Sequence, residues 1–498
     1  MRASRTRSGR RCSKRSGRTR TSTGTSARST TSGCSRFPRR AGRPSTPGRS
    51  GSTSRTGSNA RPRSEPIPLL SGTTRRVARN HDAAAWPLGV GCRHRGGGVE
   101  SRVTIVGAGP AGALLAWLLS SRGIETLLVE RQSDFEREFR GEILMPSGLR
   151  ALAEAGVELA KDELLPLRFF EGWMNGRAFI QADADAAGGD FLPPSAVSQP
   201  KLLERLVAMS EATGHFSLER GATVRRIERS ADGSSVLHVR SDAGDSKVEA
   251  RYLIGADRRG AVTRRALAPR VRNRGAMLDV VWFKMAYPEA WQPGTARFVG
   301  GRGQLLIAIA TADGLLQMGW VILKGTFGDL KSRSHDEWVA ELWNHADSEL
   351  ADHIGRHAET ITRPFLLNVV SDRVLGWASP GALLIGDAAH TMSPVGGQGV
   401  NIALRDAIVA ANELVPAFSN GGDVDAAAAR IEPARARELD VIQRMQAMPP
   451  RVMLGTRGIH ALARRVASRF LSTSFGQARA SVGGRLFFDG VVDVELTV

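Results

Sequence analysis

Cysteine is nearly absent from this sequence. Its 498 residues include three cysteines, and all three, Cys12, Cys34 and Cys92, lie in the first hundred positions. The chain beyond them has no means of forming a disulfide bond or a thiolate metal site. Apolar runs of membrane-spanning length are also missing, because Asp313 divides the longest candidate. These absences argue against a disulfide-stapled secreted domain and a membrane-spanning protein, and we expect a cytoplasmic one.

Acidic residues are scarce in the first part of the chain. Residues 1–98 hold 23 of the 69 lysines and arginines but only two of the 49 acids, Glu65 and Asp82. The rest of the chain has 46 basic and 47 acidic residues and is close to neutral. The formal charge of +20 is therefore local, and we expect no specific nucleic-acid partner.

Residues 1–98 also lack periodic apolar residues and any apolar stretch typical of a secretory signal, so we predict a disordered leader. Three interpretations stay open. The leader could be a basic arm that binds nucleic acid or an acidic surface, or a tolerated disordered extension. In the third interpretation it is not translated in the native protein, and Val99 is an alternative start. We favour the third, and peptides from residues 1–90 in the native protein would rule it out.

A strand, a glycine-rich turn and a helix follow the leader. Residues 103–106 form an apolar strand, and Gly107, Gly109 and Gly112 have the spacing of a dinucleotide-binding turn. The first glycine makes the tight turn, the second admits a pyrophosphate, and the third allows close helix packing. Glu130, which closes the next strand, is placed to accept bonds from a ribose. This pattern predicts a site for NAD or FAD.

A second strand, turn and helix span residues 382–407. Residues 382–385 read as a buried strand, Gly386 and Asp387 stop it, and a glycine cluster at 396–399 opens a helix. Glycines at a helix start let a ligand approach bare amide groups, and the helix dipole favours negative charge there.

The second stretch resembles a known motif. Gly386-Asp387-Ala388-Ala389-His390, then Pro394, Gly396, Gly399, Asn401 and Asp406-Ala407, is similar to the second flavin-binding motif of the FAD-dependent aromatic hydroxylases. These are single-component monooxygenases of the p-hydroxybenzoate hydroxylase type. The resemblance covers residues 101–450 well and selects FAD as the cofactor.

The resemblance also implies roles for individual residues. Asp387 would bond the ribityl chain, and Pro394 with the glycine turn would lie against the isoalloxazine ring. Arg140 would pair with phosphate or ribose oxygens, and Gln199 would contact the cofactor or cap its helix. The expected FAD-binding residues are Gly107, Gly109, Ala111, Gly112, Glu130, Arg131, Arg140, Gln199, Asp257, Gly386, Asp387, Pro394, Gly397, Gln398, Gly399, Val400 and Asn401.

One motif departs from the family. The family has Gly-Ala-Asp-Gly followed by a serine and an arginine, where this sequence has Gly-Ala-Asp257-Arg258 with Ala261 in place of the serine. Asp257 and Arg264 match. The segment is implicated in NAD(P)H use in the family, so the departure bears on how the reductant binds.

The resemblance implies an α/β fold with a Rossmann-type FAD-binding domain, an inserted antiparallel β substrate domain and C-terminal helices. We expect the FAD-binding domain at 99–170, 200–275 and 376–430, the substrate domain at 171–199 and 276–375, and the helical region at 431–498. Alternation predicts strands at 277–287 and 315–323, and a meander at 221–256. A helix over 426–448 is expected to break at Pro449-Pro450 and resume at 452–471.

By resemblance, the activity is hydroxylation of an aromatic or polycyclic substrate with NAD(P)H, bound transiently, and O2, through a flavin C4a-hydroperoxide. Two alternatives stay open: an FAD-dependent reductase of an isoprenoid or polyene, and a non-catalytic flavoprotein. We assign no catalytic acid or base. We also assign no metal site, because His345, His353 and His357 lack an acid motif. The protein is expected to be a monomer or homodimer without a membrane span.

Overall fold

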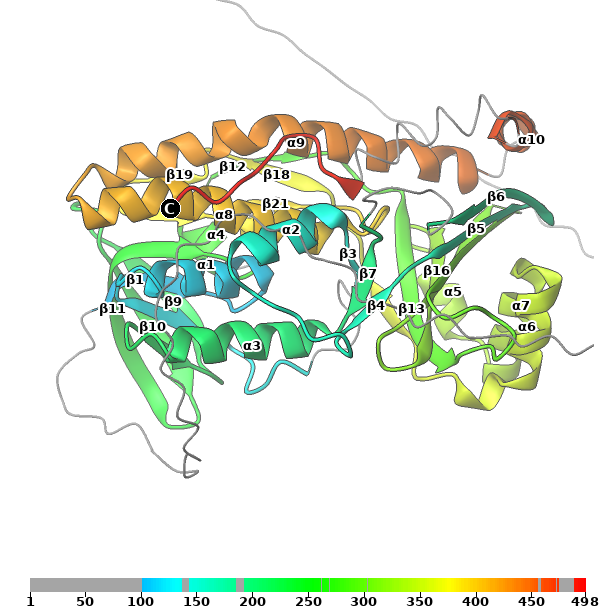
Figure 1. The fold of residues 1–498 in the computed structure, drawn as a ribbon, viewed down its shortest axis with the longest axis horizontal. Coiled ribbons are helices and arrows are strands. Elements are labelled where there is room, and N and C mark those ends of the chain that lie inside the picture. The colour runs from blue at the N-terminus through cyan, green and yellow to red at the C-terminus, as the bar shows by residue number, and fades with distance from the viewer. Residues whose placement is uncertain are drawn as a thin grey trace, which may run out of the picture. The chain divides into compact units, whose positions relative to one another are not determined.

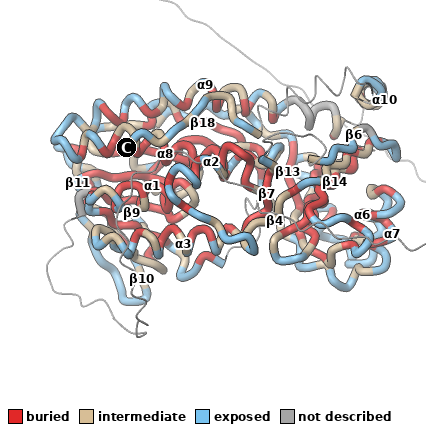
Figure 2. Tube along the Cα trace, viewed as in Figure 1, coloured by how far each residue is buried: buried red, intermediate tan, exposed pale blue. Residues whose placement is uncertain are grey.

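The computed structural model describes residues 101–136, 143–184, 192–260, 262–267, 269–301, 303–455, 458–471, 473 and 488–498. The leader and Arg140 lie outside these residues. A central sheet carries the glycine-rich turns, and residues 103–106, 126–129, 252–255 and 382–384 of its strands are buried (Figures 1 and 2). In spatial order they are β19 (Ala378–Ser379), β20 (Ala382–Leu384), β11 (Gly244–Gly255), β1 (Ser101–Val106), β2 (Thr126–Val129) and β8 (Phe216–Glu219).

Neighbours from β20 to β8 run parallel, so the turns that follow β1, β2, β11 and β20 gather at one edge. The strands β9 (Thr223–Arg229) and β10 (Ser235–Ser241) extend the sheet as the expected meander. The second half of β11 pairs in parallel with β1, with Tyr252 opposite Val103. The sequence predicted β11 as a strand of an antiparallel meander, because its first half alternates like a hairpin strand. The parallel pairing of its second half with β1 was not predicted.

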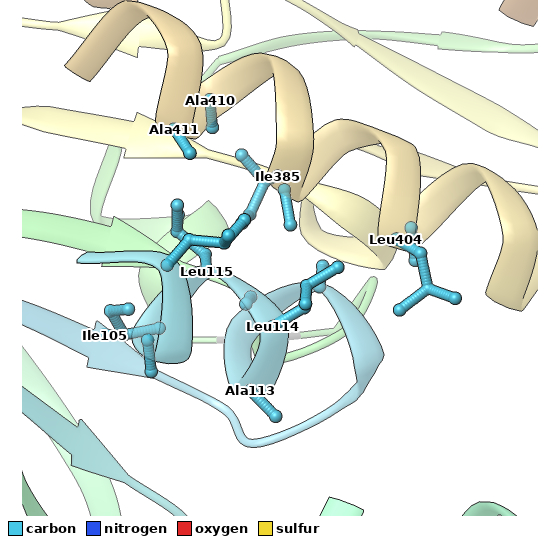
Figure 3. Close-up of a cluster of buried hydrophobic side chains, with 14 of the residues drawn as sticks. Ile105, Ala113, Leu114, Leu115, Ile385, Leu404, Ala410 and Ala411 are labelled. Atoms are coloured by element: carbon cyan, nitrogen blue, oxygen red, sulfur yellow. The ribbon is translucent and has the colours of Figure 1, made fainter. Parts of the chain in front are cut away.

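Helices cover the central sheet. They are α1 (Pro110–Ser120), α2 (Pro146–Glu154), α3 (Gln199–Glu211), α4 (Val262–Leu267), α8 (Gln398–Ser419) and α9 (Val424–Met453). Helix α10 (Gly458–Leu471) instead contacts α9 and the strand at residues 177–183 (Figure 1). Helices α1 and α8 pack together, and Leu114, Leu115 and Ile385 lie between them (Figure 3). Burying each such side chain stabilises the fold by about 1.5–3 kcal/mol. This contact brings both glycine-rich helix starts into one core.

A seven-stranded sheet forms the other large layer. Its order is β17 (Phe365–Leu367), β13 (Leu278–Ala286), β16 (Leu315–Leu323), β15 (Gln304–Ala310), β14 (Thr295–Gly301), β5 (Phe169–Met174) and β6 (Arg177–Asp183). Helices α5 (Phe327–Lys331), α6 (His335–His345) and α7 (Ser348–Arg356), with the 3-10 turn η1 (Ala358–Thr360), belong to this part of the chain. The boundaries expected for the two domains remain a prediction.

Two smaller sheets accompany these two large ones. One consists of β12 (Arg270–Asn273), β18 (Asp372–Leu375) and β21 (His390–Thr391), and the other of β3 (Ile143–Leu144), β7 (Ser195–Val197) and β4 (Leu164–Pro166). The 3-10 turn η2 (Gly386–Ala388) connects β20 to β21.

The expected break at Pro449-Pro450 is wrong, because α9 continues to Met453. An interior proline removes one backbone hydrogen bond and its ring crowds the preceding turn, which weakens or kinks a helix without always ending it. The C-terminal residues 488–498 then return along α8 (Figure 1). The backbone amide of Thr497 donates to Asn412 Oδ1 at 2.9 Å, and that of Leu496 donates to Glu154 Oε2 at 2.9 Å.

Candidate FAD-binding site

The three glycines after β1 have three different surroundings. Gly107 has a φ of +103°, and a Cβ on it would lie 2.7 Å from the carbonyl oxygen of Ala256. A Cβ on Gly112 would lie 2.0 Å from the carbonyl oxygen of Gly107. A Cβ on Gly109 would meet nothing within 4 Å. The first and third glycines are therefore required by packing, and the second leaves open space at the start of α1.

Glu130 stabilises this turn from the end of β2. Its side chain is buried, Oε2 accepts a 2.8 Å hydrogen bond from the amide of Ala108, and Oε1 accepts one of 3.1 Å from Gln132. The predicted ribose acceptor is thus built into the glycine turn itself.

A cavity of about 310 Å³ opens beside the turn. Its walls come from the turn after β1, the end of β2, the start of β9 and the segment after β11. Four arginines and two acids supply its charge, so an anionic ligand is favoured. The charged lining residues are Glu130, Arg131, Arg225, Asp257, Arg258 and Arg265.

Asp257 lies in this wall directly after β11. Burial raises the pKa of its carboxyl to about 6, although hydrogen bonds from the amide and hydroxyl of Thr263 act in the opposite direction. Arg258, which stands where the family has glycine, has a left-handed φ of +78°. Arg264 is buried away from the cavity and donates through Nε to the carbonyl of Ala388 at 2.8 Å. Its two other guanidinium nitrogens donate to Asp372 at 2.9 and 3.0 Å.

The turn after β20 packs against the first turn of α1. Gly386 has a φ of +55°, and a Cβ there would lie 3.0 Å from the Cβ of Ala111. Asp387 is exposed although residues 382–386 and 388–391 are all buried. The predicted ribityl-binding carboxylate therefore lies at the surface of the turn, next to the open start of α1.

The start of α8 is shaped by two left-handed glycines. The amide of Gly397 donates to the carbonyl of Pro394 at 3.0 Å, and Gly396 and Gly397 have φ values of +77° and +61°. This is a type II turn with its glycine where the positive φ is needed. A Cβ on Gly399 would meet nothing within 4 Å, so the first turn of a 22-residue helix is open to a ligand.

The side chain of Asn401 is fully buried and points into the protein. Its Nδ2 donates to Gly397 O at 2.8 Å and to Ile143 O at 3.3 Å, and its Oδ1 accepts from the amide of Met145 at 2.8 Å. It therefore ties the helix start to the segment before α2. Any contact from Asn401 to a cofactor would come from its backbone, and its role as a cofactor ligand remains a prediction.

The other predicted residues lie around these turns. Gln398 is buried and its Nε2 donates to Gly396 O at 3.0 Å. Gln199 is buried at the start of α3, where Ser198 rather than Gln199 caps the helix by accepting from Lys201. Val400 is buried in the first turn of α8.

A buried ionic network behind the flavin turn was not expected from the sequence. His390 lies 2.6 Å from Asp406 through Nε2, and Arg435 Nε donates to the same carboxylate at 2.8 Å. Asp406 also accepts from the amide of Gly386 at 3.1 Å. Burial alone would raise the pKa of Asp406, but His390 and Arg435 hold it below its usual range. In the sequence, only the positions of Asp406 and His390 within the flavin motif pointed to this network, and no pattern pointed to Arg435.

The two apolar faces of the seven-stranded sheet pack against different parts of the chain. On one face, Val281, Phe283 and Met318 form a core with Trp338 of α6 and Leu350 of α7. The opposite face carries the half-buried residues Trp282, Leu305 and Ile307 in a cluster that also includes Val395 of the glycine turn. This opposite face therefore lies beside the start of α8.

Within the described residues, no group of three or more His, Cys, Asp or Glu side chains is arranged to hold a metal ion. His353 donates through Nε2 to Ala286 O at 2.8 Å, and His345 lies 3.2 Å from Glu341. Helices in the same described part of the chain are all too short or too polar to span a membrane.

A family model described as an FAD binding domain matches residues 100–444. The chain is 31% identical over 385 residues to 6-methylpretetramide 4-monooxygenase of Streptomyces rimosus, an alignment that covers 75% of this chain and 90% of that protein. It is 28% identical over 315 residues to 3-(3-hydroxy-phenyl)propionate/3-hydroxycinnamic acid hydroxylase of Mycolicibacterium smegmatis. The second alignment covers 61% of this chain and 53% of that protein, so the chain spans about half of it.

A solved structure shares the fold. The p-nitrophenol 4-monooxygenase of Pseudomonas putida superposes with a TM-score of 0.66 and 16% sequence identity. The superposition covers 79% of this chain and 99% of that one.

Proposed function

Because the chain belongs to the FAD-binding domain family of flavoprotein monooxygenases, we propose that it hydroxylates an aromatic or polycyclic compound with NAD(P)H and O2. FAD is its cofactor, as the family match implies. The relatives named above are monooxygenases or hydroxylases of ring compounds, which supports this substrate class.

The observation that carries the proposal is the meeting of three distant segments at the start of α1. Gly107 lies against Ala256, and Gly386 lies against Ala111, so the first turn, the segment after β11 and the turn after β20 are in contact. The starts of α1 and α8 both leave open space at a glycine. An extended, partly anionic dinucleotide fits such a pair of open helix starts.

The residues present fit the two halves of FAD. Glu130 and Arg131 would hold the ADP half in the cavity beside Gly109, where arginine charge meets phosphate. Asp387 would accept bonds from the ribityl hydroxyls, and the amides at 397–400 would face the ring. When bound, FAD supplies the redox chemistry, accepting electrons from NAD(P)H and activating O2.

The protein's part is orientation and exclusion of water. The open amides at the start of α8 would stabilise negative charge on the reduced ring, supported by the helix dipole. The apolar sheet face with Trp282, Leu305 and Ile307 would hold the substrate near the turn at Val395 and keep water out. No single side chain here is proposed as an acid or base.

The full-length protein should be purified and its visible spectrum recorded first. Bands of oxidised flavin, with FAD released on denaturation, are expected. A panel of phenols and polycyclic aromatics should then stimulate NAD(P)H oxidation, with consumption of O2 and appearance of a hydroxylated product. A folded protein without flavin would overturn the proposal. Flavin reduction that yields a reduced product without O2 uptake would favour the isoprenoid reductase instead, and no stimulation by any compound would favour a non-catalytic flavoprotein.

A further inference from the structure

Arg258 has an unusual backbone conformation for its residue type. Among the described residues other than glycine, only Asn175 and Arg258 have a positive φ, +50° and +78°. Asparagine tolerates this region because its short polar side chain forms local hydrogen bonds that offset the crowding of Cβ against the following carbonyl, whereas arginine lacks this compensation. Arg258 therefore carries a conformational cost that a glycine at the same position would not carry.

The cost is located in the wall of the 310 Å³ cavity. Arg258 lines the cavity together with Gly107, Gly109 and Glu130, the residues at the open start of α1. Its neighbour Asp257 lines the same wall and is mostly buried. An ionised Asp257 would repel a phosphate, so a cation at the adjacent position offsets that repulsion.

Arg258 differs from the other arginines of the cavity in its anchoring. Arg131 and Arg265 are exposed, and Arg225 is exposed on β9, so their charge is screened by solvent. Arg258 is half-buried, where a guanidinium interacts more strongly with an anion. Its position three residues after the buried end of β11 also limits how far its backbone can move.

We infer that Arg258 is a cofactor-affinity residue that binds the diphosphate of FAD, and that this chain tolerates left-handed backbone strain to place an arginine there. The inference rests on the proposed function for the identity of the dinucleotide. It predicts that stability of the cofactor-free protein and affinity for FAD change in opposite directions when Arg258 becomes glycine.

The test compares Arg258→Gly with the unaltered full-length protein after removal of flavin. The melting temperature of the apoprotein should rise by about 2 °C, because the strain is relieved. The Kd for FAD, measured by quenching of flavin fluorescence, should increase about tenfold, as expected for loss of a charge-assisted hydrogen bond. The Kd for ADP as a competitor should increase by the same factor, and the dependence of both on salt should become weaker.

Asn175→Gly is the matched control. Asn175 is the other non-glycine residue with positive φ, and it lies in the turn between β5 and β6, outside the cavity lining. Its replacement should leave both Kd values unchanged. Arg258→Lys should keep part of the affinity.

Two results would overturn the inference. Equal affinity of Arg258→Gly and the unaltered protein for both FAD and ADP would show that Arg258 does not hold the diphosphate. A lower melting temperature of the glycine variant would show that the left-handed backbone is not strained. If the unaltered apoprotein bound neither FAD nor ADP, the proposed function would fall, and the inference with it.

Discussion

The two glycine-rich helix starts present open amides in different ways. At α1, backbone contacts with other strands define the turn, since Gly107 and Gly112 have no room for a side chain. At α8, side chains define it, since Asn401 bonds to Gly397, Ile143 and Met145. The first start tolerates no added atom at two positions, and the second depends on one buried amide side chain.

The buried acids beside the two starts also differ. Asp257, near α1, has its pKa raised to about 6 by burial, although the hydrogen bonds from Thr263 and the charge of Arg265 act in the opposite direction. Asp406, in α8, is more deeply buried, but His390 and Arg435 lower its pKa. A buried carboxylate with cationic partners stabilises the native state at neutral pH, whereas one without them destabilises it.

The largest expected effect comes from Gly112→Ala. The new Cβ would lie 2.0 Å from Gly107 O, so α1 must move away from the turn. We expect a loss of about 3 kcal/mol in the free energy of unfolding, measured with urea. Gly109→Ala is the control, because its Cβ meets nothing within 4 Å. That variant should fold normally but bind FAD more weakly, and equal stability of the two variants would contradict the difference drawn between these glycines.

The start of α8 should be destabilised by removal of the Asn401 side chain. Asn401→Ala leaves the amide of Met145 and the carbonyls of Gly397 and Ile143 without their partner. The expected loss is about 2–3 kcal/mol, since a fully buried group without its partner costs about 1–3 kcal/mol and two of these three bonds are only partly buried. Thermal unfolding measures it, with the exposed Asn420→Ala at the end of the same helix as control. An equally small effect in both variants would show that the helix start does not need the amide.

The two acids should respond to pH in opposite directions. Because the folded pKa of Asp257 is above its unfolded value of 3.8, its stabilising contribution is present below pH 4 and is lost as the pH rises through about 6. Asp257→Asn should abolish that loss, which is at most about 3 kcal/mol. The contribution of Asp406 has the reverse sign and is lost on acidification, so Asp406→Asn should be least stable relative to the unaltered protein near neutral pH. Urea unfolding at pH 4 and pH 7 distinguishes the two, and parallel curves would refute the contrast.

The smallest effect is expected at Gly399. Alanine is a better helix former than glycine by up to about 1 kcal/mol, and a Cβ there meets nothing within 4 Å. Gly399→Ala should therefore raise the melting temperature of the apoprotein slightly while weakening FAD binding. An unchanged FAD affinity would mean that the open space at this turn is not used by the cofactor.

Much of the fold could be predicted from local patterns. The strands at 103–106 and 382–385, and the helices that follow, were located from apolar period and glycine placement, which are properties of neighbouring residues. The parallel role of β11 could not be predicted, because it depends on pairing with β1, far away in the chain. The continuation of α9 through Pro449-Pro450 was missed for a related reason, since local propensity alone does not place a helix end.

The sequence by itself determined the two strand-turn-helix units, the family of the chain and the identity of its cofactor. These depend on the φ preference of glycine and on motif spacing, which are properties of residues close together in the chain. Only the tertiary structure decided which side chains face the site. Arg264 and Asn401 both belong to the motifs, yet they bond inward to groups 124 and more than 250 residues away. Alternation likewise located two faces of the seven-stranded sheet, but only packing against α6 and α7 decided which is core. The alternation of apolar residues shows which side chains of one strand share a face. Which face is buried depends on how the other helices and strands pack against the sheet.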